Sequence, residues 1–266
     1  MEKFQYNLHI HSAKSNCAKP EMTLPAIMDR ALSADFDLIG ISDHIDLRER
    51  PADFLFETKA EIDALNPPIP ILAGCETTQI APHVFALSDE TAQALDYVIV
   101  ACNHYHLPHV EQPPDPTLEA FASHHFQMLE GAILWKYTDI IAHPFCPRVP
   151  EAIRNDFDFE RLERSYSEAQ LRNIILLACQ HDVAFEINPG YYFRMPRVYK
   201  ILIAEGKKAG LKFSPGTDAH SLSSVDFSFH FRGKDSYSAL MSAFGLRWSD
   251  IRLKKCEPYA RSAGTI

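Results

Sequence analysis

The sequence predicts an α/β protein built on a parallel sheet, and it favours a barrel over an open sheet. Short apolar segments typical of strands alternate with longer amphipathic segments typical of helices. The chain has 266 residues, and α/β barrels of roughly 250 residues form single domains. It has only 10 glycines and neither GxGxxG nor GxxxxGK(S/T), the glycine-rich motifs that bind nucleotide phosphates. We therefore expect residues 1–266 to form one barrel domain.

The predicted strands are short and apolar, and the predicted helices carry apolar residues at the i, i+3, i+4 spacing. The expected strands are residues 4–10, 38–42, 69–73, 84–87, 97–101, 139–142, 184–187 and 212–214. The expected helices are residues 23–34, 118–137, 158–181 and 197–209. Proline breaks both kinds of element, so residues 67–70 and 113–116 are expected to be loops.

Composition and charge narrow the class of protein. The apolar share of 46% and the charged share of 23% are ordinary for a globular chain. The 26 Lys and Arg against 35 Asp and Glu give a net charge of −9, which argues against a partner that is a nucleic acid polymer. The sequence has no apolar run of about 18 residues and no signal-peptide core at its start, so we expect no membrane segment and a cytoplasmic location.

Residue types that ligate metals follow most of the predicted strands. They are His9 and His11, Asp43 and His44, Glu76, His104, His143, and Asp218 and His220. The carboxyl ends of parallel barrel strands meet at one face, and residues i and i+2 of a strand point the same way. Imidazole and carboxylate together suit zinc, manganese or iron, and a carboxylate such as Glu76 can bridge two ions. The sequence therefore predicts a metal site at this face.

The order of these motifs resembles that of the polymerase and histidinol phosphatase (PHP) superfamily. In that superfamily HxH is followed by DH, a lone Glu, a lone His, HP and finally DxH, and every step is present between His9 and His220. The resemblance implies a distorted (β/α)7 TIM-like barrel with a di- or trinuclear metal site. It also implies a phosphatase, an enzyme that hydrolyses a phosphate ester with a metal-activated water.

The resemblance also assigns the ligands of each ion. One ion would be held by His9, His11, Glu76 and Asp218, and a second by Glu76, His104 and His143. A third would use His44, His220 and the residue six positions after the HxH motif. That residue is usually His or Asp in the superfamily and is Cys17 here. Cys17 is therefore either a thiolate ligand or a bystander, and the site holds two or three divalent ions of zinc, manganese or iron.

Further residues are candidates for catalysis and for substrate binding. Glu76, Asp218 and His220 would act at the metal centre, and Asp43 would either orient His44, accept a leaving-group proton or cap a helix. Arg194 follows Asn188-Pro189-Gly190 at the spacing of a phosphate-binding arginine in histidinol-phosphatase-like members. The other candidates, for contacts to substrate or to the ligands, are Arg148, His106, Glu186 and Asn188.

The sequence thus predicts a metal-dependent phosphoesterase that acts on a small phosphomonoester, and the resemblance makes histidinol phosphate the named candidate. The alternatives are an amidohydrolase-type enzyme that cleaves C–N bonds and a non-catalytic metal-binding module. The DH, HP and DxH order matches the PHP pattern better than the amidohydrolase pattern. We expect specificity to reside in loops at residues 45–68 and 105–117, and the sequence leaves the oligomeric state open.

Overall fold

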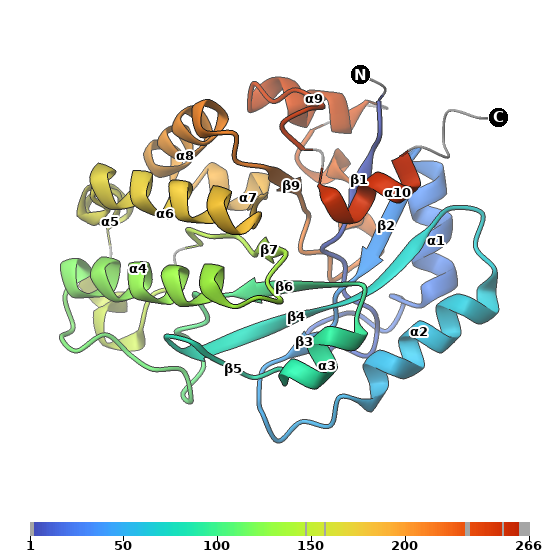
Figure 1. Cartoon of the computed structure of the whole chain (residues 1–266), viewed down its shortest axis with the longest axis horizontal. Helices are drawn as coiled ribbons and strands as arrows, with labels where there is room; N and C mark the ends of the chain where they lie inside the picture. The colour runs from blue at the N-terminus through green and yellow to red at the C-terminus, as the bar shows by residue number, and fades with distance from the viewer. Residues whose placement is uncertain (1–2, 147, 157, 232–234, 252, 261–266) are drawn as a thin grey trace.

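Seven parallel strands form a nearly closed barrel in a computed structural model of the chain, which describes residues 3–146, 148–156, 158–231, 235–251 and 253–260 (Figure 1). Their order around the barrel is β1, β2, β4, β6, β7, β8 and β9. The strands are β1 (Tyr6–Asn7), β2 (Leu38–Ile41), β3 (His44–Ile45), β4 (Ile71–Ala81), β5 (Val84–Phe85), β6 (Tyr97–Ala101), β7 (Ile140–Ile141), β8 (Ala184–Ile187) and β9 (Phe213–Pro215). The predicted distorted (β/α)7 barrel is confirmed.

The first and last strands approach each other beyond their regular ladders. A parallel bridge joins Ile10 to Ala219. The His11 N–H donates to the Ala219 carbonyl at 2.9 Å, and the Ala219 N–H donates to the His9 carbonyl at 3.2 Å. The predicted strand at 4–10 is therefore divided: its first part pairs with β2, and its second part bends toward the segment after β9.

Two strands differ in length from the prediction for physical reasons. β1 is only Tyr6–Asn7 because its ladder with β2 ends there. β4 continues to Ala81 because its second half pairs with β3, with β6 and, in the antiparallel sense, with β5. The extension of β4 carries Glu76 inside a regular strand rather than at its end.

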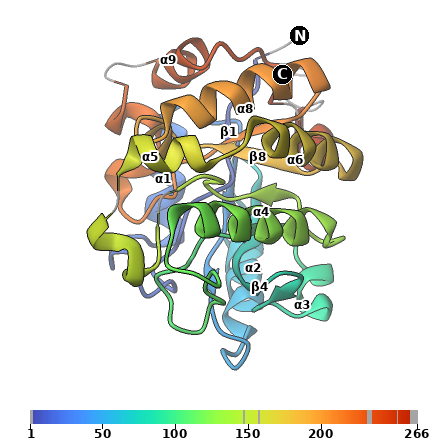
Figure 2. The ribbon, with the colours of Figure 1, turned by 90° about the vertical axis from the view of Figure 1, so that its left-hand side faces the viewer.

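Helices cover the outside of the barrel, with α4, α5, α6 and α8 on one side and α1 and α2 on another (Figure 2). The helices are α1 (Leu24–Ser33), α2 (Asp53–Leu65), α3 (Asp89–Ala94), α4 (Leu118–Leu134), α5 (Phe159–Ser165), α6 (Glu168–His181), α7 (Pro189–Tyr192), α8 (Pro196–Ala209), α9 (Ser236–Ala243) and α10 (Glu257–Ala260). Short 3-10 turns occupy η1 (Glu151–Asp156), η2 (Leu222–Ser224), η3 (Phe227–Phe229) and η4 (Lys254–Cys256).

Two helical predictions need correction. The predicted helix at 158–181 is two helices, because Tyr166 takes an extended conformation between α5 and α6 and buries its ring. The predicted specificity loop at 45–68 contains helix α2, which buries Leu55, Thr58 and Ile62. In the part of the chain that the structure describes, we find no helix with the length and apolar character to cross a bilayer.

Tyr97, the first residue of β6, lies inside the amino-terminal end of the barrel. Its hydroxyl donates to the Leu8 carbonyl at 2.6 Å. A Cβ atom at Gly74 would lie 2.4 Å from the Tyr97 ring, and one at Gly40 would lie 2.3 Å from its hydroxyl. Glycine is required at both positions because any larger residue would overlap the ring. This end of the barrel is therefore filled, and the polar residues collect at the carboxyl end.

Candidate metal centre

Side chains from six strands and the segments that follow them meet at the carboxyl end of the barrel. Their order is His9 and His11 after β1, His44 in β3, Glu76 in β4, His104 after β6, His143 after β7, and Asp218 and His220 after β9. The imidazole rings of His9 and His143 lie 5.7 Å apart although 134 positions separate them in the sequence. All eight predicted ligands other than Cys17 therefore belong to one cluster.

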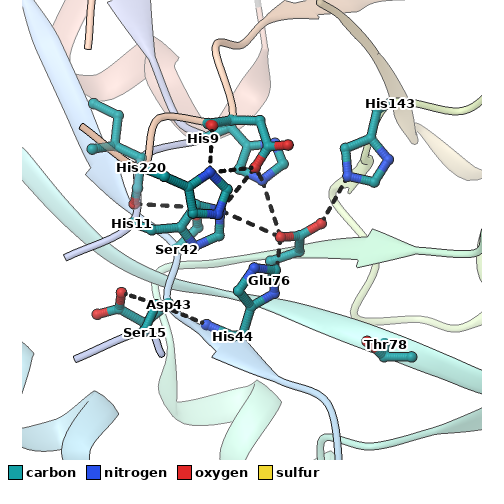
Figure 3. A network of polar contacts seen from close by, with 12 residues as sticks. His9, His11, Ser15, Ser42, Asp43, His44, Glu76, Thr78, His143 and His220 are labelled. Carbon is teal, nitrogen blue, oxygen red and sulfur yellow. Dashed lines mark hydrogen bonds and ion pairs between the residues drawn. The ribbon is translucent and has the colours of Figure 1, made fainter. Parts of the chain in front are cut away.

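The Glu76 carboxylate lies between two sets of imidazole rings (Figure 3). Its Oε2 atom is 3.1 Å from His9 Nε2 and 3.1 Å from His44 Nδ1. Its Oε1 atom is 3.1 Å from His143 Nε2 and 3.9 Å from His104 Nε2. Each oxygen thus has its own group of nitrogen donors, which is the arrangement required of a carboxylate that bridges two ions.

Three groups of ligand atoms, each with all members within 4.8 Å of one another, can be defined among the described residues. They are His9, His11, Glu76 and Asp218; Glu76, His104 and His143; and His11, His44 and His220. The first two reproduce the ligand sets that the resemblance implies. The third contains His11 where the prediction had Cys17.

Several buried polar atoms of the cluster have no hydrogen-bond partner in the described part of the chain. They are His9 Nε2, His11 Nδ1, His44 Nδ1, His104 Nε2, His143 Nδ1 and Glu76 Oε2. Buried polar atoms nearly always have a partner, and an unpaired one costs about 1–3 kcal/mol. Nitrogen and oxygen donors that converge in this way fit a divalent cation.

Neighbouring polar groups hold the ring of each ligand so that one nitrogen faces the cluster. The His9 Nδ1–H donates to Glu186 Oε1 at 2.9 Å. The Thr78 hydroxyl donates to Asp46 at 2.6 Å and so accepts from His104 Nδ1 at 2.7 Å. In both rings Nε2 is left facing Glu76, and histidines that bind metals are usually oriented by such a hydrogen bond at the other ring nitrogen. Glu186 therefore fulfils the predicted contact to a ligand.

Charged neighbours keep the carboxylates ionised. Burial would raise the pKa of the Glu76 carboxyl, but His44 and His9 hold that pKa well below its usual range. Burial likewise opposes ionisation of Asp218, and His9 and His11 hold its pKa well below the usual range. Both side chains are therefore anionic, the state in which they can ligate a cation.

The imidazoles differ in protonation. Burial, followed by the neighbouring His44, lowers the pKa of His11 to about 3, and burial also holds the pKa of His104 well below its usual range. These two rings are neutral. Burial opposes protonation of His9 as well, but Glu186, Glu76 and Asp218 together raise its pKa well above the usual value. A cation bound at His9 must therefore displace a proton.

Two of the ligands have backbone conformations that favour glycine. His143 has φ of 27° and Asp218 has φ of 52°. Such conformations cost non-glycine residues free energy and cluster at functional sites. The His143 N–H donates to Glu186 Oε2, so the carboxylate that orients His9 also supports this strained segment.

The contacts of Asp43 agree with one of its predicted alternatives, the orientation of His44. It is fully buried, and it accepts hydrogen bonds from the Ser12 N–H at 2.7 Å, the Ser12 hydroxyl at 2.6 Å and the Ser15 hydroxyl at 2.7 Å. The Ser15 hydroxyl accepts from the His44 N–H at 3.1 Å. These contacts fasten the loop after His11 to His44, and they favour a positioning role over the predicted catalytic one.

A pocket of about 410 Å³ opens over the cluster. Its lining includes the predicted residues Cys17, His106 and Arg148, together with Asp46 and Arg50. Cys17 is exposed at the rim, where its thiol contacts the His220 imidazole. It belongs to none of the three ligand groups defined by the described residues, so its role as a ligand stays a prediction.

The two predicted phosphate-binding arginines lie in different environments. Arg148 lines the pocket and lies close to Tyr191. The Arg194 side chain is exposed and is not among the described residues that line this pocket. The helix α7, capped by Asn188, brings Tyr191 to the cluster instead, with its ring 5.2 Å from that of His143. The predicted substrate contact of Asn188 is thus replaced by a capping role.

Sequence reasoning missed Thr78, Tyr191, Asp46 and Arg50. Thr78 lies two positions after Glu76 in β4, and residues i and i+2 of a strand share a face. That spacing alone could have identified it. Tyr191 and Arg50 reach the site from outside the strands, and Arg50 is held there by donating to the His44 carbonyl at 2.9 Å. No spacing rule predicts those two positions.

The architecture and the donor set define an α/β barrel with a candidate metal centre at its carboxyl end. The solved structures with this fold include the histidinol phosphate phosphatase of Lactococcus lactis subsp. lactis, in complex with zinc, L-histidinol and phosphate. It is 15% identical in sequence, with a TM-score of 0.62, and the match covers 91% of this chain and 94% of that one. No protein-family model and no curated protein matches the sequence.

A proposed histidinol phosphatase of Listeria monocytogenes has the same fold. It is 12% identical, with a TM-score of 0.58, and the match covers 88% of this chain and 100% of that one. The chain therefore has the same fold as these two proteins, in agreement with the barrel expected from the order of its histidine and carboxylate motifs.

Proposed function

We propose that the protein is a metal-dependent phosphoesterase that hydrolyses a small phosphomonoester. The observation that carries this proposal is the Glu76 carboxylate, whose two oxygens face separate groups of imidazole donors beneath an open pocket. The fold similarity to a phosphatase whose structure contains zinc and phosphate supports the same class of reaction.

We assign the first ion to His9, His11, Glu76 and Asp218, and the second to Glu76, His104 and His143. A third ion would be held by His44 and His220, with Cys17 beside them. When bound, the ions would supply a hydroxide near neutral pH and neutralise charge on the phosphoryl oxygens. Zinc, manganese and iron all suit these ligands.

The side chains that line the pocket would bind and orient the substrate. Arg148 is the strongest candidate for the phosphoryl oxygens, because a guanidinium offers several donors in a fixed plane and this one faces the cluster. Arg50 adds a second positive charge to the same pocket. Asp46 is the carboxylate among the described lining residues, so we assign to it, in place of Asp43, the transfer of a proton from the attacking water to the leaving-group oxygen.

Histidinol phosphate is the first substrate to test. The fold neighbour from Lactococcus lactis binds L-histidinol and phosphate, and this chain matches it over nearly its whole length. Two features differ from the superfamily pattern: Cys17 replaces the usual His or Asp, and Arg194 is exposed. A substrate related to histidinol phosphate but different in its alcohol portion is consistent with those departures.

Metal analysis followed by phosphate release tests this proposal. The protein, purified without chelator and loaded in turn with zinc, manganese and iron(II), is incubated with a panel of phosphomonoesters that includes histidinol phosphate. We expect at least one ester to be hydrolysed by a loaded form, and Glu76→Gln to abolish the activity. Absence of phosphate release from every ester with every metal would contradict the proposal.

A further inference from the structure

A second pocket adjoins the metal pocket and shares two of its lining residues, His106 and Leu107. Its volume is about 520 Å³. Pockets that hold small molecules typically measure about 300–1,000 Å³. Five of its lining residues are prolines, so we call it the proline pocket: Pro108, Pro113, Pro114, Pro116 and Pro150. It is large enough to hold a substantial part of a substrate whose phosphate lies at the metal centre.

The wall shared by the two pockets is joined directly to a metal ligand. The Leu107 N–H donates to the His104 carbonyl at 2.9 Å, which closes a tight turn between them. The His106 ring lies 5.3 Å from the His104 ring. The shared wall of the two pockets therefore lies two and three positions along the chain from His104.

The loop that forms this pocket is held in one conformation by several hydrogen bonds. His109 Nε2–H donates to the Asp46 carbonyl at 2.8 Å. Gln112 donates to the Val110 carbonyl at 2.7 Å, and the Tyr105 hydroxyl hydrogen-bonds to His124 at 2.9 Å. Proline also fixes the backbone φ angle. A pocket that is already ordered binds a ligand without a further loss of conformational entropy in its own loop.

The two pockets differ in charge. Arg50 and Arg148 line the metal pocket, whereas the lining residues described for the proline pocket include no Lys or Arg. The charged residue of the proline pocket is Glu151, an exposed residue at the start of η1. Its proline and leucine surfaces suit the flat apolar face of a ring. Among the lining residues that the structure describes, a negatively charged group would meet the Glu151 carboxylate and no Lys or Arg side chain.

We propose that the proline pocket binds the alcohol portion of the substrate, and that this alcohol carries a ring and is uncharged or cationic. This inference rests on the proposed function, because it takes the phosphate to lie at the metal centre. Esters whose alcohol carries a second anion are disfavoured substrates. Esters of small acyclic alcohols leave the pocket empty and bind weakly.

Binding of phosphonates, which cannot be hydrolysed, tests the pocket apart from catalysis. Titration calorimetry on the zinc-loaded protein compares 3-phenylpropylphosphonate with propylphosphonate. We expect the ring to strengthen binding about ten- to a hundredfold, since it buries apolar surface. Ala152→Trp should fill the pocket and remove this advantage, whereas Ala94→Trp, on the exposed end of α3, should preserve it. Equal affinities of the two phosphonates for the wild type would overturn the inference.

A charge series tests the predicted preference. Phenylpropylphosphonates that carry a para aminomethyl group or a para carboxylate differ only far from the phosphonate. We expect the aminomethyl compound to bind about tenfold more tightly or better, and Glu151→Lys to reverse the order. A carboxylate compound that binds wild type as tightly as the aminomethyl compound would overturn the charge preference.

Hydrolysis of two alkyl esters separates failure of this inference from failure of the proposed function. 2-Phenylethyl phosphate and ethyl phosphate both have alkoxide leaving groups. If the ring strengthens phosphonate binding but neither ester releases phosphate, the proposed phosphoesterase activity is refuted. The assignment of the proline pocket is then unaffected. Release from both esters with equal kcat/KM, together with equal phosphonate affinities, would refute the pocket assignment alone.

Discussion

The hydroxyl of Tyr191 donates a hydrogen bond of 3.1 Å to Oδ2 of Asp218. The other carboxylate oxygen, Oδ1, lies 3.1 Å from His11 Nε2 and 3.4 Å from His9 Nε2. Tyr191 thus occupies the oxygen that faces away from the imidazoles and leaves Oδ1 directed at the first ligand group. Arg148 lies close to the same tyrosine, so a predicted phosphate-binding group neighbours the residue that holds a predicted metal ligand.

Tyr191→Phe should weaken the metal centre without removing a ligand. Residues that orient metal ligands typically affect metal affinity or activity by about 10–100-fold. We expect a loss of that size in zinc affinity, measured by competition with a chromophoric chelator, and a parallel fall in kcat/KM. Tyr192→Phe is the control, because Tyr192 packs against Phe244 away from the cluster. Unchanged zinc affinity in Tyr191→Phe would show that the hydrogen bond does not position Asp218.

Arg148→Gln should weaken binding of inorganic phosphate while metal content stays the same. A charge-assisted hydrogen bond contributes about 1.5–3 kcal/mol, so the inhibition constant for phosphate should rise about ten- to a hundredfold. The measurement is product inhibition of phosphate release. The same substitution at exposed Arg194 should have a smaller effect. The opposite ranking would return the phosphate-binding role to Arg194, as the sequence had suggested.

Cys17→Ser tests whether a third ion is present. The thiol contacts His220, and a zinc thiolate bond measures about 2.3 Å. If Cys17 is a ligand, the variant should bind up to one ion fewer per chain by atomic emission spectroscopy. Cys179→Ser, in helix α6, should leave the stoichiometry as in the wild type. Equal stoichiometry in all three proteins would make Cys17 a bystander.

His125 should make the stability of the protein depend on pH. Burial lowers the pKa of His125 to about 3 in the folded chain, below its ordinary value of 6.5. The unfolded chain therefore binds the proton first as the pH falls, so this contribution is complete above pH 6.5 and is lost between pH 6.5 and 3.

Urea unfolding of chelator-treated proteins at pH 7 and pH 4.5 measures this contribution. His125→Gln should lower the pH dependence of the unfolding free energy by up to about 1.4 kcal/mol per pH unit. His181→Gln, at the exposed end of α6, should retain the wild-type dependence. A His125→Gln variant with the wild-type pH dependence would contradict the assignment of a buried neutral imidazole.

The cluster could be predicted from sequence because its members occur at or beside strand ends in a fixed order. His9 and His11, for example, share a face through their i, i+2 spacing. Spacing could not decide among the alternatives for Asp43, because it does not show which neighbours a carboxylate will bind; here Ser12 and Ser15 approach it from another loop. Tyr191 was missed because a short helix brings it over the cluster.

Most strands of the fold could also be predicted from the sequence, whereas helix α2 could not. The strands of the barrel are short apolar segments, and that signal is local. Helix α2 was missed because its pattern is irregular: its buried stripe includes Thr58, whose hydroxyl donates to the Phe54 carbonyl, and Phe56 is 41% exposed. That helix is stabilised by tertiary contacts, and a regular spacing of apolar residues does not identify it in the sequence.

Anomalous diffraction from crystals of the zinc-loaded protein can determine whether Glu76 bridges two metal ions. We expect two zinc peaks, each about 2.0–2.2 Å from a different oxygen of Glu76. One peak should also lie within bonding distance of His9, His11 and Asp218, and the other within bonding distance of His104 and His143. A single zinc ion bound to both oxygens, or zinc bound elsewhere with Glu76 free, would contradict the account.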